Sequence, residues 1–138
     1  MPKLSICGEA LIDFVPFKGA EGQTGYTPKP GGSPYNAAKA AARAGADVSF
    51  LGAISNDFFG DQLKQHLEES GVYCDAVPRN RHPSTLAFVD LSSGDPRYAF
   101  FNNDTSTSNM APTVAMIEPQ SGDILDVGSI SLNDLPGA

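Results

Sequence analysis

Short apolar runs alternate with polar, glycine-rich stretches at the start of the chain. Leu4–Cys7 and Ala10–Val15 are apolar and are closed by Gly8 and Pro16, so both are expected to be extended. Residues 18–30 carry few apolar side chains and several glycines and prolines, a composition typical of an exposed loop or an edge ribbon. The pattern predicts two extended segments followed by an exposed connection.

An alanine-rich segment predicts a first helix over residues 34–44. Ser33 is a suitable N-cap, Pro34 suits the first helical position, and Gly45 is a natural stop. The apolar run at residues 47–54 then predicts another strand.

A second helix is expected from a cap at Asn56 or Asp57 to about Ser70, with Gly71 as its stop. Apolar side chains recur on one face at four-residue spacing, at Phe59, Leu63 and Leu67. The order strand, helix, strand, helix predicts an α/β fold with parallel strands.

The second half of the chain changes character. Residues 85–91 and 97–101 are strand-like and are joined by the turn cluster at 92–96, which predicts a β-hairpin. Together with residues 14–30, this hairpin is expected to form a small sheet separate from the parallel one. A further strand of buried type is expected at residues 123–130.

Composition and charge narrow the class of protein. The 138 residues are 41% hydrophobic, enough for the core of one domain, and their net charge of −7 argues against nucleic acid or an anionic membrane as the partner. Only Cys7 and Cys74 are present, so no disulfide scaffold is indicated. Neither a signal peptide nor a membrane-spanning run is found, and a cytoplasmic location is expected.

Two places carry candidate chemistry. The corner Gly31–Asn36 combines two glycines, which admit a ligand close to the backbone, with Asn36 in the first helical turn. On these residues alone, the pattern favours a plain strand-to-helix turn with a good cap over a ligand site. Asp13, between Ile12 and Phe14, is either a turn cap or a carboxylate that binds two neighbouring hydroxyls of a polyol.

Other candidates are weaker. Glu9 is interpreted as a structural residue that accepts a hydrogen bond from the backbone at the Gly8 turn. Asn102 and Asn103 follow an aromatic pair and could supply hydrogen bonds to a ligand, but a solvated loop is the favoured interpretation. Neither a dinucleotide fingerprint nor a phosphate-binding Gly-Lys-Ser/Thr loop occurs in the sequence. The two histidines and two cysteines are isolated, so no metal site is expected.

Three motifs occur in order along the chain: Gly8-Glu9-Ala10-Leu11-Ile12-Asp13, Gly31-Gly32-Ser33-Pro34-Tyr35-Asn36-Ala37-Ala38, and Leu51-Gly52-Ala53-Ile54-Ser55-Asn56-Asp57-Phe58-Phe59-Gly60. Together they resemble the N-terminal part of the ribokinase / phosphofructokinase-B family of carbohydrate kinases. The resemblance runs from Ile6 to Leu132 and is nearest to sugar kinases of the fructokinase type.

The resemblance implies a ribokinase-like α/β/α core, largely parallel, with a small β lid formed by residues 14–30 and 85–101. Site roles carry over to positions that match the family pattern. The implied substrate-binding residues are Asp13, Gly31, Gly32, Asn36, Phe101 and Asn103. The arginine common near residue 102 in ketodeoxygluconate kinases is not evident here, which favours a neutral ketose.

The family also implies ATP and Mg²⁺, bound mainly by a C-terminal half whose Gly-Ala-Gly-Asp element supplies the catalytic aspartate. No such element occurs in this sequence, so no catalytic residue is assigned. The chain is therefore expected to be the truncated, sugar-binding part of one kinase domain over residues 1–138, and to be inactive alone.

Several alternatives remain open at this point. One alternative is a non-catalytic sugar-sensing or interaction module. Another is that the chain is part of a ketodeoxygluconate or nucleoside kinase of the same family. A homodimer through the lid is expected by analogy with the family.

Overall fold

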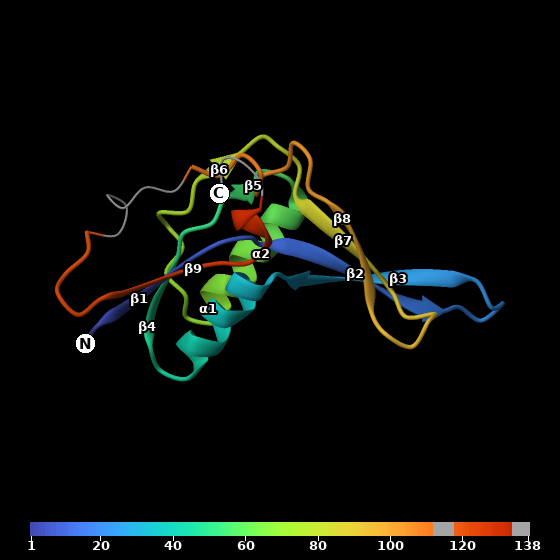
Figure 1. Cartoon of the computed structure of the whole chain (residues 1–138), viewed down its shortest axis with the longest axis horizontal. Coiled ribbons are helices and arrows are strands. Elements are labelled where there is room, and N and C mark those ends of the chain that lie inside the picture. Colours follow the sequence, from blue (N-terminus) through green and yellow to red (C-terminus); the bar gives the residue numbers. More distant parts are fainter. Residues whose placement is uncertain (112–117, 134–138) are drawn as a thin grey trace.

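A three-stranded parallel sheet forms the base of the structure, a computed structural model that describes residues 1–111 and 118–133. Its strands are β1 (Lys3–Cys7), β4 (Asp47–Phe50) and β9 (Ile124–Val127), in the order β4-β1-β9 (Figure 1). Both neighbours run parallel to β1, which confirms the parallel pairing expected from the sequence.

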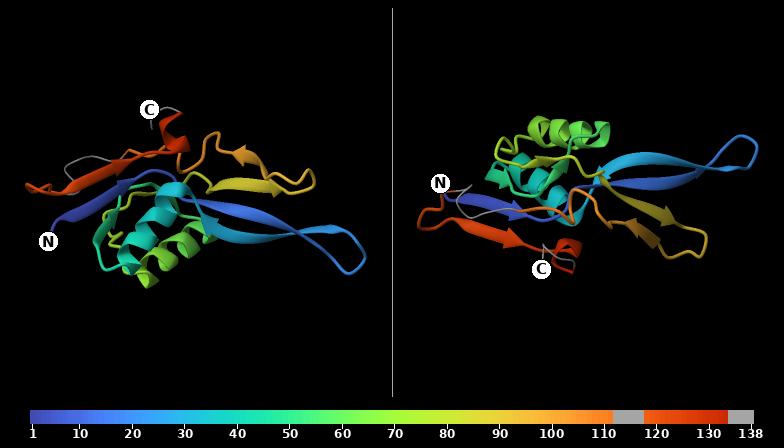
Figure 2. Two further views of the ribbon diagram at one scale, coloured as in Figure 1. Left: turned by 60° about the horizontal axis from the view of Figure 1, so that its bottom comes forward. Right: turned by 90° about the horizontal axis from the view of Figure 1, so that it is seen from above.

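Two helices lie on the same side of this sheet, as Figure 2 shows: α1 (Ser33–Arg43) and α2 (Phe58–Glu69). The prediction that Ser33 caps α1 is wrong by one residue. Gly32 is the N-cap, with a positive φ of 108° that disfavours other residues, and no side chain caps the helix. Of the two caps predicted for α2, Asn56 and Asp57, the structure uses Asp57, which accepts a hydrogen bond from the backbone N–H of Gly60.

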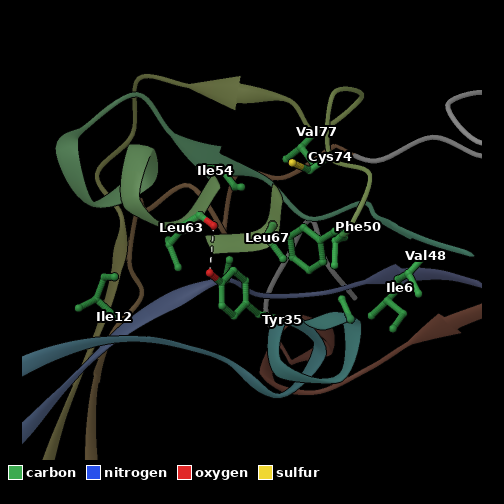
Figure 3. Close-up of a cluster of buried hydrophobic side chains, with 13 residues drawn as sticks. Ile6, Ile12, Tyr35, Val48, Phe50, Ile54, Leu63, Leu67, Cys74 and Val77 are labelled. Carbon is green, nitrogen blue, oxygen red and sulfur yellow. Dashed lines mark hydrogen bonds between the residues drawn. The ribbon is translucent and has the colours of Figure 1, made fainter. Parts of the chain in front are cut away.

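The buried core lies between the helices and the parallel sheet (Figure 3). At its centre the hydroxyl of Tyr35, on α1, donates a 2.9 Å hydrogen bond to the carbonyl of Leu63, on α2. The ring of Tyr35 also meets that of Phe50 edge-on, with centroids 6.1 Å apart. These contacts tie both helices to β4 and hold the start of α1 in a fixed position.

A second sheet extends away from the core (Figure 1). Its strands are β2 (Leu11–Lys18), β3 (Thr24–Gly31), β7 (Thr85–Asp90) and β8 (Arg97–Phe101), in the order β3-β2-β7-β8. The β7–β8 hairpin is confirmed, and the exposed ribbon is β3, an edge strand. The inner pair, β2 and β7, runs parallel, so this sheet joins two segments that are distant in the sequence.

Two sequence-based strand predictions need correction. The strand expected over residues 47–54 is divided: β5 (Ile54–Ser55) leaves the parallel sheet and pairs with β6 (Arg79–Asn80). The break lies at Gly52, where a Cβ would collide with the carbonyl oxygen of Gly8 and with the ring of Phe50.

The last strand is shorter than expected and is exposed. Residues 123–130 were expected to form a strand of buried type, but β9 covers only Ile124–Val127. A short 3₁₀ turn follows at Ile130–Leu132. Ile124 is 59% exposed, because among the described strands β9 has β1 as its one neighbour.

Candidate functional site

A cleft of about 470 Å³ lies where the parallel sheet meets the second sheet. The loop between β1 and β2, the start of β2 and the first turn of α1 form its core side, and β8 and the turn after β9 form the rest. Its lining residues are Glu9, Leu11, Asp13, Gly32, Ser33, Asn36, Tyr98, Phe100, Ser129 and Ile130. The cleft thus brings together the two regions singled out in the sequence, Asp13 and the double-glycine corner.

Asp13 enters the cleft from the third position of β2. It is half-buried, and burial raises the pKa of its carboxyl above the ordinary value. A Cβ on Gly31, on the neighbouring strand, would collide with Oδ2 of Asp13. Glycine at position 31 therefore leaves the space that the Asp13 carboxylate occupies, although Gly31 does not itself line the cleft.

The corner beside Asp13 is equally tight. A Cβ on Gly32 would lie 2.7 Å from the carbonyl oxygen of Glu9, so only glycine allows the chain to pass this close. The carbonyl of Gly32 accepts the first helical hydrogen bond, 2.9 Å from the backbone nitrogen of Asn36. This fixes Asn36 in the first turn of α1, where its exposed side chain lines the cleft and presents both a donor and an acceptor.

Glu9 is a lining residue for which the sequence favoured a structural role. The residue is only 2% exposed, yet its Oε2 has no hydrogen-bond partner among the described residues. The interpretation that Glu9 satisfies the backbone at the Gly8 turn is therefore wrong. The apolar neighbours Ala10 and Leu11 gave no signal in the sequence that this carboxylate would be left unpaired.

An aromatic pair forms the wall on the second sheet. Tyr98 and Phe100, two residues apart on β8, are stacked with centroids 5.8 Å and ring planes 12° apart. Both are about half exposed and both line the cleft. Side chains alternate across a strand, so these two rings share one face.

Phe101 and Asn103 do not line the cleft. The ring of Phe101 packs edge-on against Phe88, with centroids 5.6 Å apart, on the opposite face of β8 from Phe100. Asn103 is exposed in the loop after β8. Of the residues singled out in the sequence, the structure gathers Asp13, Gly32 and Asn36 at the cleft, with Gly31 behind Asp13.

Residues 1–111 and 118–133 offer neither a metal-ion cluster nor a membrane-spanning helix. No group of three or more His, Cys, Asp or Glu side chains in these ranges is placed to hold a metal ion. The helices there are too short or too polar to cross a bilayer. Cys7 and Cys74 are free and buried, and burial raises the pKa of Cys74 to about 11, which disfavours a reactive thiolate.

Several known proteins are similar to this chain in sequence. Fructokinase from Rhizobium leguminosarum bv. trifolii is 39% identical over 136 residues, a match covering 94% of this chain and 40% of the relative. Fructokinase from Solanum tuberosum is 34% identical over 131 residues, covering 91% of this chain and 41% of that protein. The chain thus spans about 40% of the length of the curated relatives that it matches.

Solved structures share the fold as well. Fructokinase from Vibrio cholerae O395, in a form with fructose, ADP and calcium ion bound, superposes with a TM-score of 0.83 at 28% identity, over 99% of this chain and 44% of that one. Fructokinase from Xylella fastidiosa with bound ATP gives 0.69 at 33% identity, over 75% of this chain and 34% of that one. The expected ribokinase-like fold is confirmed. A model described as pfkB family carbohydrate kinase matches residues 1–138, and the chain belongs to this family.

Proposed function

We propose that this chain is the sugar-binding part of an ATP-dependent fructokinase, which transfers the γ-phosphate of ATP to a sugar hydroxyl. The observation that carries the proposal is the cleft of about 470 Å³. Asp13 and Asn36 line it on the core side, and Tyr98 and Phe100 line it on the second sheet. The fructokinases among the relatives support the reaction, and the Vibrio cholerae structure contains fructose.

The chemistry of the cleft suits a polyol. The Asp13 carboxylate accepts hydrogen bonds from two adjacent hydroxyls, and the Asn36 amide both donates and accepts. The stacked rings of Tyr98 and Phe100 offer an apolar surface to the C–H face of a sugar. Gly31 contributes by leaving room for Asp13, and Gly32 by letting the chain pass close to Glu9.

The second sheet is proposed to act as the lid of this cleft, with residues 14–30 and 85–101 as its two segments. Two observations support this role. The sheet carries the aromatic wall of the cleft on β8, and it projects from the core (Figure 2). Phe101 and Asn103, which the family resemblance implies as substrate residues, would contact sugar only if the lid moved, because they lie outside the present lining.

Phosphoryl transfer itself is proposed for the complete enzyme, with ATP as donor and Mg²⁺ as the metal. Structures of relatives with ATP and with ADP and calcium ion support nucleotide binding. The described residues contain no acidic or histidine cluster that fits a metal ion, so no step is assigned to the metal here. We propose that the 138 residues alone bind sugar without turning it over.

The test measures fructose binding by NMR titration of the 138-residue chain, and ATP-dependent phosphorylation by a complete protein containing it. We expect Asp13→Asn to weaken fructose binding at least tenfold. Asp47→Asn, a matched change at an exposed carboxylate on β4 outside the cleft, should leave it unchanged. No turnover of any ketose or ketoacid sugar by the complete protein would refute the kinase assignment.

A nucleoside acceptor is the second candidate, because the parallel rings of Tyr98 and Phe100 also suit a planar base. Competition between fructose and adenosine for the chain separates the two. Displacement of fructose by adenosine at lower concentration than by another ketose would favour the nucleoside. Sugar binding by the 138-residue chain, without any turnover by a complete protein, would instead favour a sugar-sensing module.

Two further expectations remain predictions. A homodimer through the lid is supported by exposed Phe17, Tyr26 and Leu91 around a second cavity of about 410 Å³ on that sheet. Analytical ultracentrifugation with and without Phe17→Ser tests it, and a monomeric wild-type chain would refute it. A cytoplasmic location is supported by the two free thiols.

A further inference from the structure

The side chain of Glu9 is buried at the cleft without a polar partner. It follows the end of β1, is 2% exposed, and lines the cleft beside Asp13. Its Oε2 is buried and accepts no hydrogen bond, and its side chain forms no ion pair with the described residues. Buried carboxylates are almost always paired, so this oxygen requires an explanation.

The fold holds Glu9 in place through its backbone. A Cβ on Gly32 would collide with the Glu9 carbonyl, and a Cβ on Gly8 would collide with the ring of Pro34. The chain therefore passes through a corner with no spare space, and Glu9 cannot withdraw its side chain to solvent by a small backbone shift. The tight corner therefore holds the Glu9 carboxylate at the cleft, although no hydrogen bond or ion pair with the described residues stabilises it there.

The cleft offers acceptors and no cation. Among the lining residues, Glu9 and Asp13 are acidic, and none is Lys, Arg or His. Neither carboxylate can donate to the other when both are ionised, so a donor for Glu9 has to come from outside the described residues, and a hydroxyl of a bound ligand is such a donor. A second effect follows for selectivity, since a ligand that carries its own carboxylate would meet two like charges and no compensating cation.

We propose that Glu9 is a second acceptor carboxylate of the sugar site, which takes a hydrogen bond from a ligand hydroxyl and restricts the site to neutral polyols. A hydroxyl of a ligand in the cleft would donate to this carboxylate, which has no donor among the described residues. The inference rests on the proposed sugar-binding function and deepens it: Asp13 and Glu9 act together, and acidic sugars are excluded.

The experiment compares the wild-type chain with Glu9→Gln, which keeps the shape of the side chain and removes its charge. Glu21→Gln is the matched control, because Glu21 is exposed in the β2–β3 turn outside the cleft. Fructose and gluconate are titrated by NMR, and urea unfolding without ligand reports the stability of each variant. Glu9→Asp is the second variant, which keeps the charge on a shorter side chain.

We expect Glu9→Gln to weaken fructose binding at least tenfold, with a urea midpoint equal to or above that of the wild type. Glu9→Asp should also weaken binding, the control should change neither property, and gluconate should bind at least tenfold more weakly than fructose. A lowered midpoint with unchanged fructose affinity would show that Glu9 serves the fold, and would overturn the inference.

The failure of the inference is distinct from that of the proposed function. Fructose binding that is lost in Asp13→Asn but unchanged in both Glu9 variants refutes the role of Glu9 alone. Gluconate affinity equal to that for fructose refutes the selectivity. A wild-type chain that folds cooperatively but binds no sugar refutes the proposed function together with this inference.

Discussion

Asp57 joins the second helix to the start of the second sheet, and its removal should loosen both. Its Oδ1 accepts hydrogen bonds from the backbone nitrogen of Gly60, at 2.8 Å, and from the hydroxyl of Ser84, at 2.7 Å. Its Oδ2 accepts from the backbone nitrogen of Ser84, also at 2.8 Å. Ser84 is buried and immediately precedes β7. The Asp57 carboxylate therefore connects α2 to β7, the strand that pairs with β8.

The magnitude follows from these three bonds. Loss of the N-cap costs about 0.5–2 kcal/mol, and the unpaired, buried N–H of Ser84 costs about 1–3 kcal/mol. Asp57→Ala removes both and is expected to destabilise the chain by about 2–4 kcal/mol. Asp57→Asn retains an oxygen for Gly60 but offers an N–H₂ group where Ser84 needs an acceptor, and should cost about 1–3 kcal/mol.

The dependence on pH has a definite sign. Burial raises the pKa of Asp57, but the hydrogen bonds from Ser84 and Gly60 outweigh it, and the pKa lies below its ordinary value of 3.8. A lowered carboxyl pKa stabilises the folded chain above 3.8, and the stabilisation is lost as the pH falls through the folded pKa. The advantage of wild type over Asp57→Asn should therefore be full at pH 7 and shrink in acid.

Urea unfolding followed by circular dichroism at pH 7, and again below pH 3.8, tests these expectations. Asp47→Asn is the control, since its carboxylate is exposed. In thermal melts, each kcal/mol should lower the Tm by roughly 4 °C in a chain of this size. The reasoning fails if Asp57→Ala stays within about 0.5 kcal/mol of wild type, the usual range for surface changes.

Four further changes separate binding from stability. Gly31→Ala should displace the Asp13 carboxylate and weaken fructose binding at least tenfold in an NMR titration, while stability changes by less than about 1 kcal/mol in urea, because the clash is with a side-chain end. Burial raises the pKa of Asp13, which means that the folded chain disfavours its ionised form, so Asp13→Asn should raise the urea midpoint at pH 7. The gain should vanish below pH 3.8, and a lowered midpoint at pH 7 would contradict this. Tyr98→Ala should weaken sugar binding with little change in the Tm, because the ring is 54% exposed. Tyr35→Phe removes the hydrogen bond to Leu63 and should cost about 1 kcal/mol in urea unfolding, and no loss would refute that estimate.

Local signals were sufficient for the helices and insufficient for the sheet edges. Asp57 and the stops at Gly45 and Gly71 act within a few residues, and both glycines have the positive φ expected of such stops. The two-residue strand β6 has no pattern of its own and is defined by its pairing with β5. The break at Gly52 likewise depends on Gly8, which is distant in the sequence.

The site shows the same division. Asp13, Gly32 and Asn36 lie in recognisable motifs and line the cleft, and their binding of sugar stays a prediction. The choice between Phe100 and Phe101 depends on which face of β8 points inward, and the pairing of β8 with β7 decides it. Two adjacent aromatic residues carry no such information by themselves, so the sequence alone could not tell which of them lines the cleft.

The parallel pairing of β2 with β7 bears on how the chain folds. Leu11 pairs with Thr85, and the helices α1 and α2 lie between them in the sequence. Each hairpin, β2–β3 and β7–β8, closes a short loop, whereas joining them closes a long one and raises the contact order of the chain. The aromatic wall on β8 can meet Asp13 only after that long loop has closed, so the cleft should be among the last features to form, with the helices and hairpins organised before it.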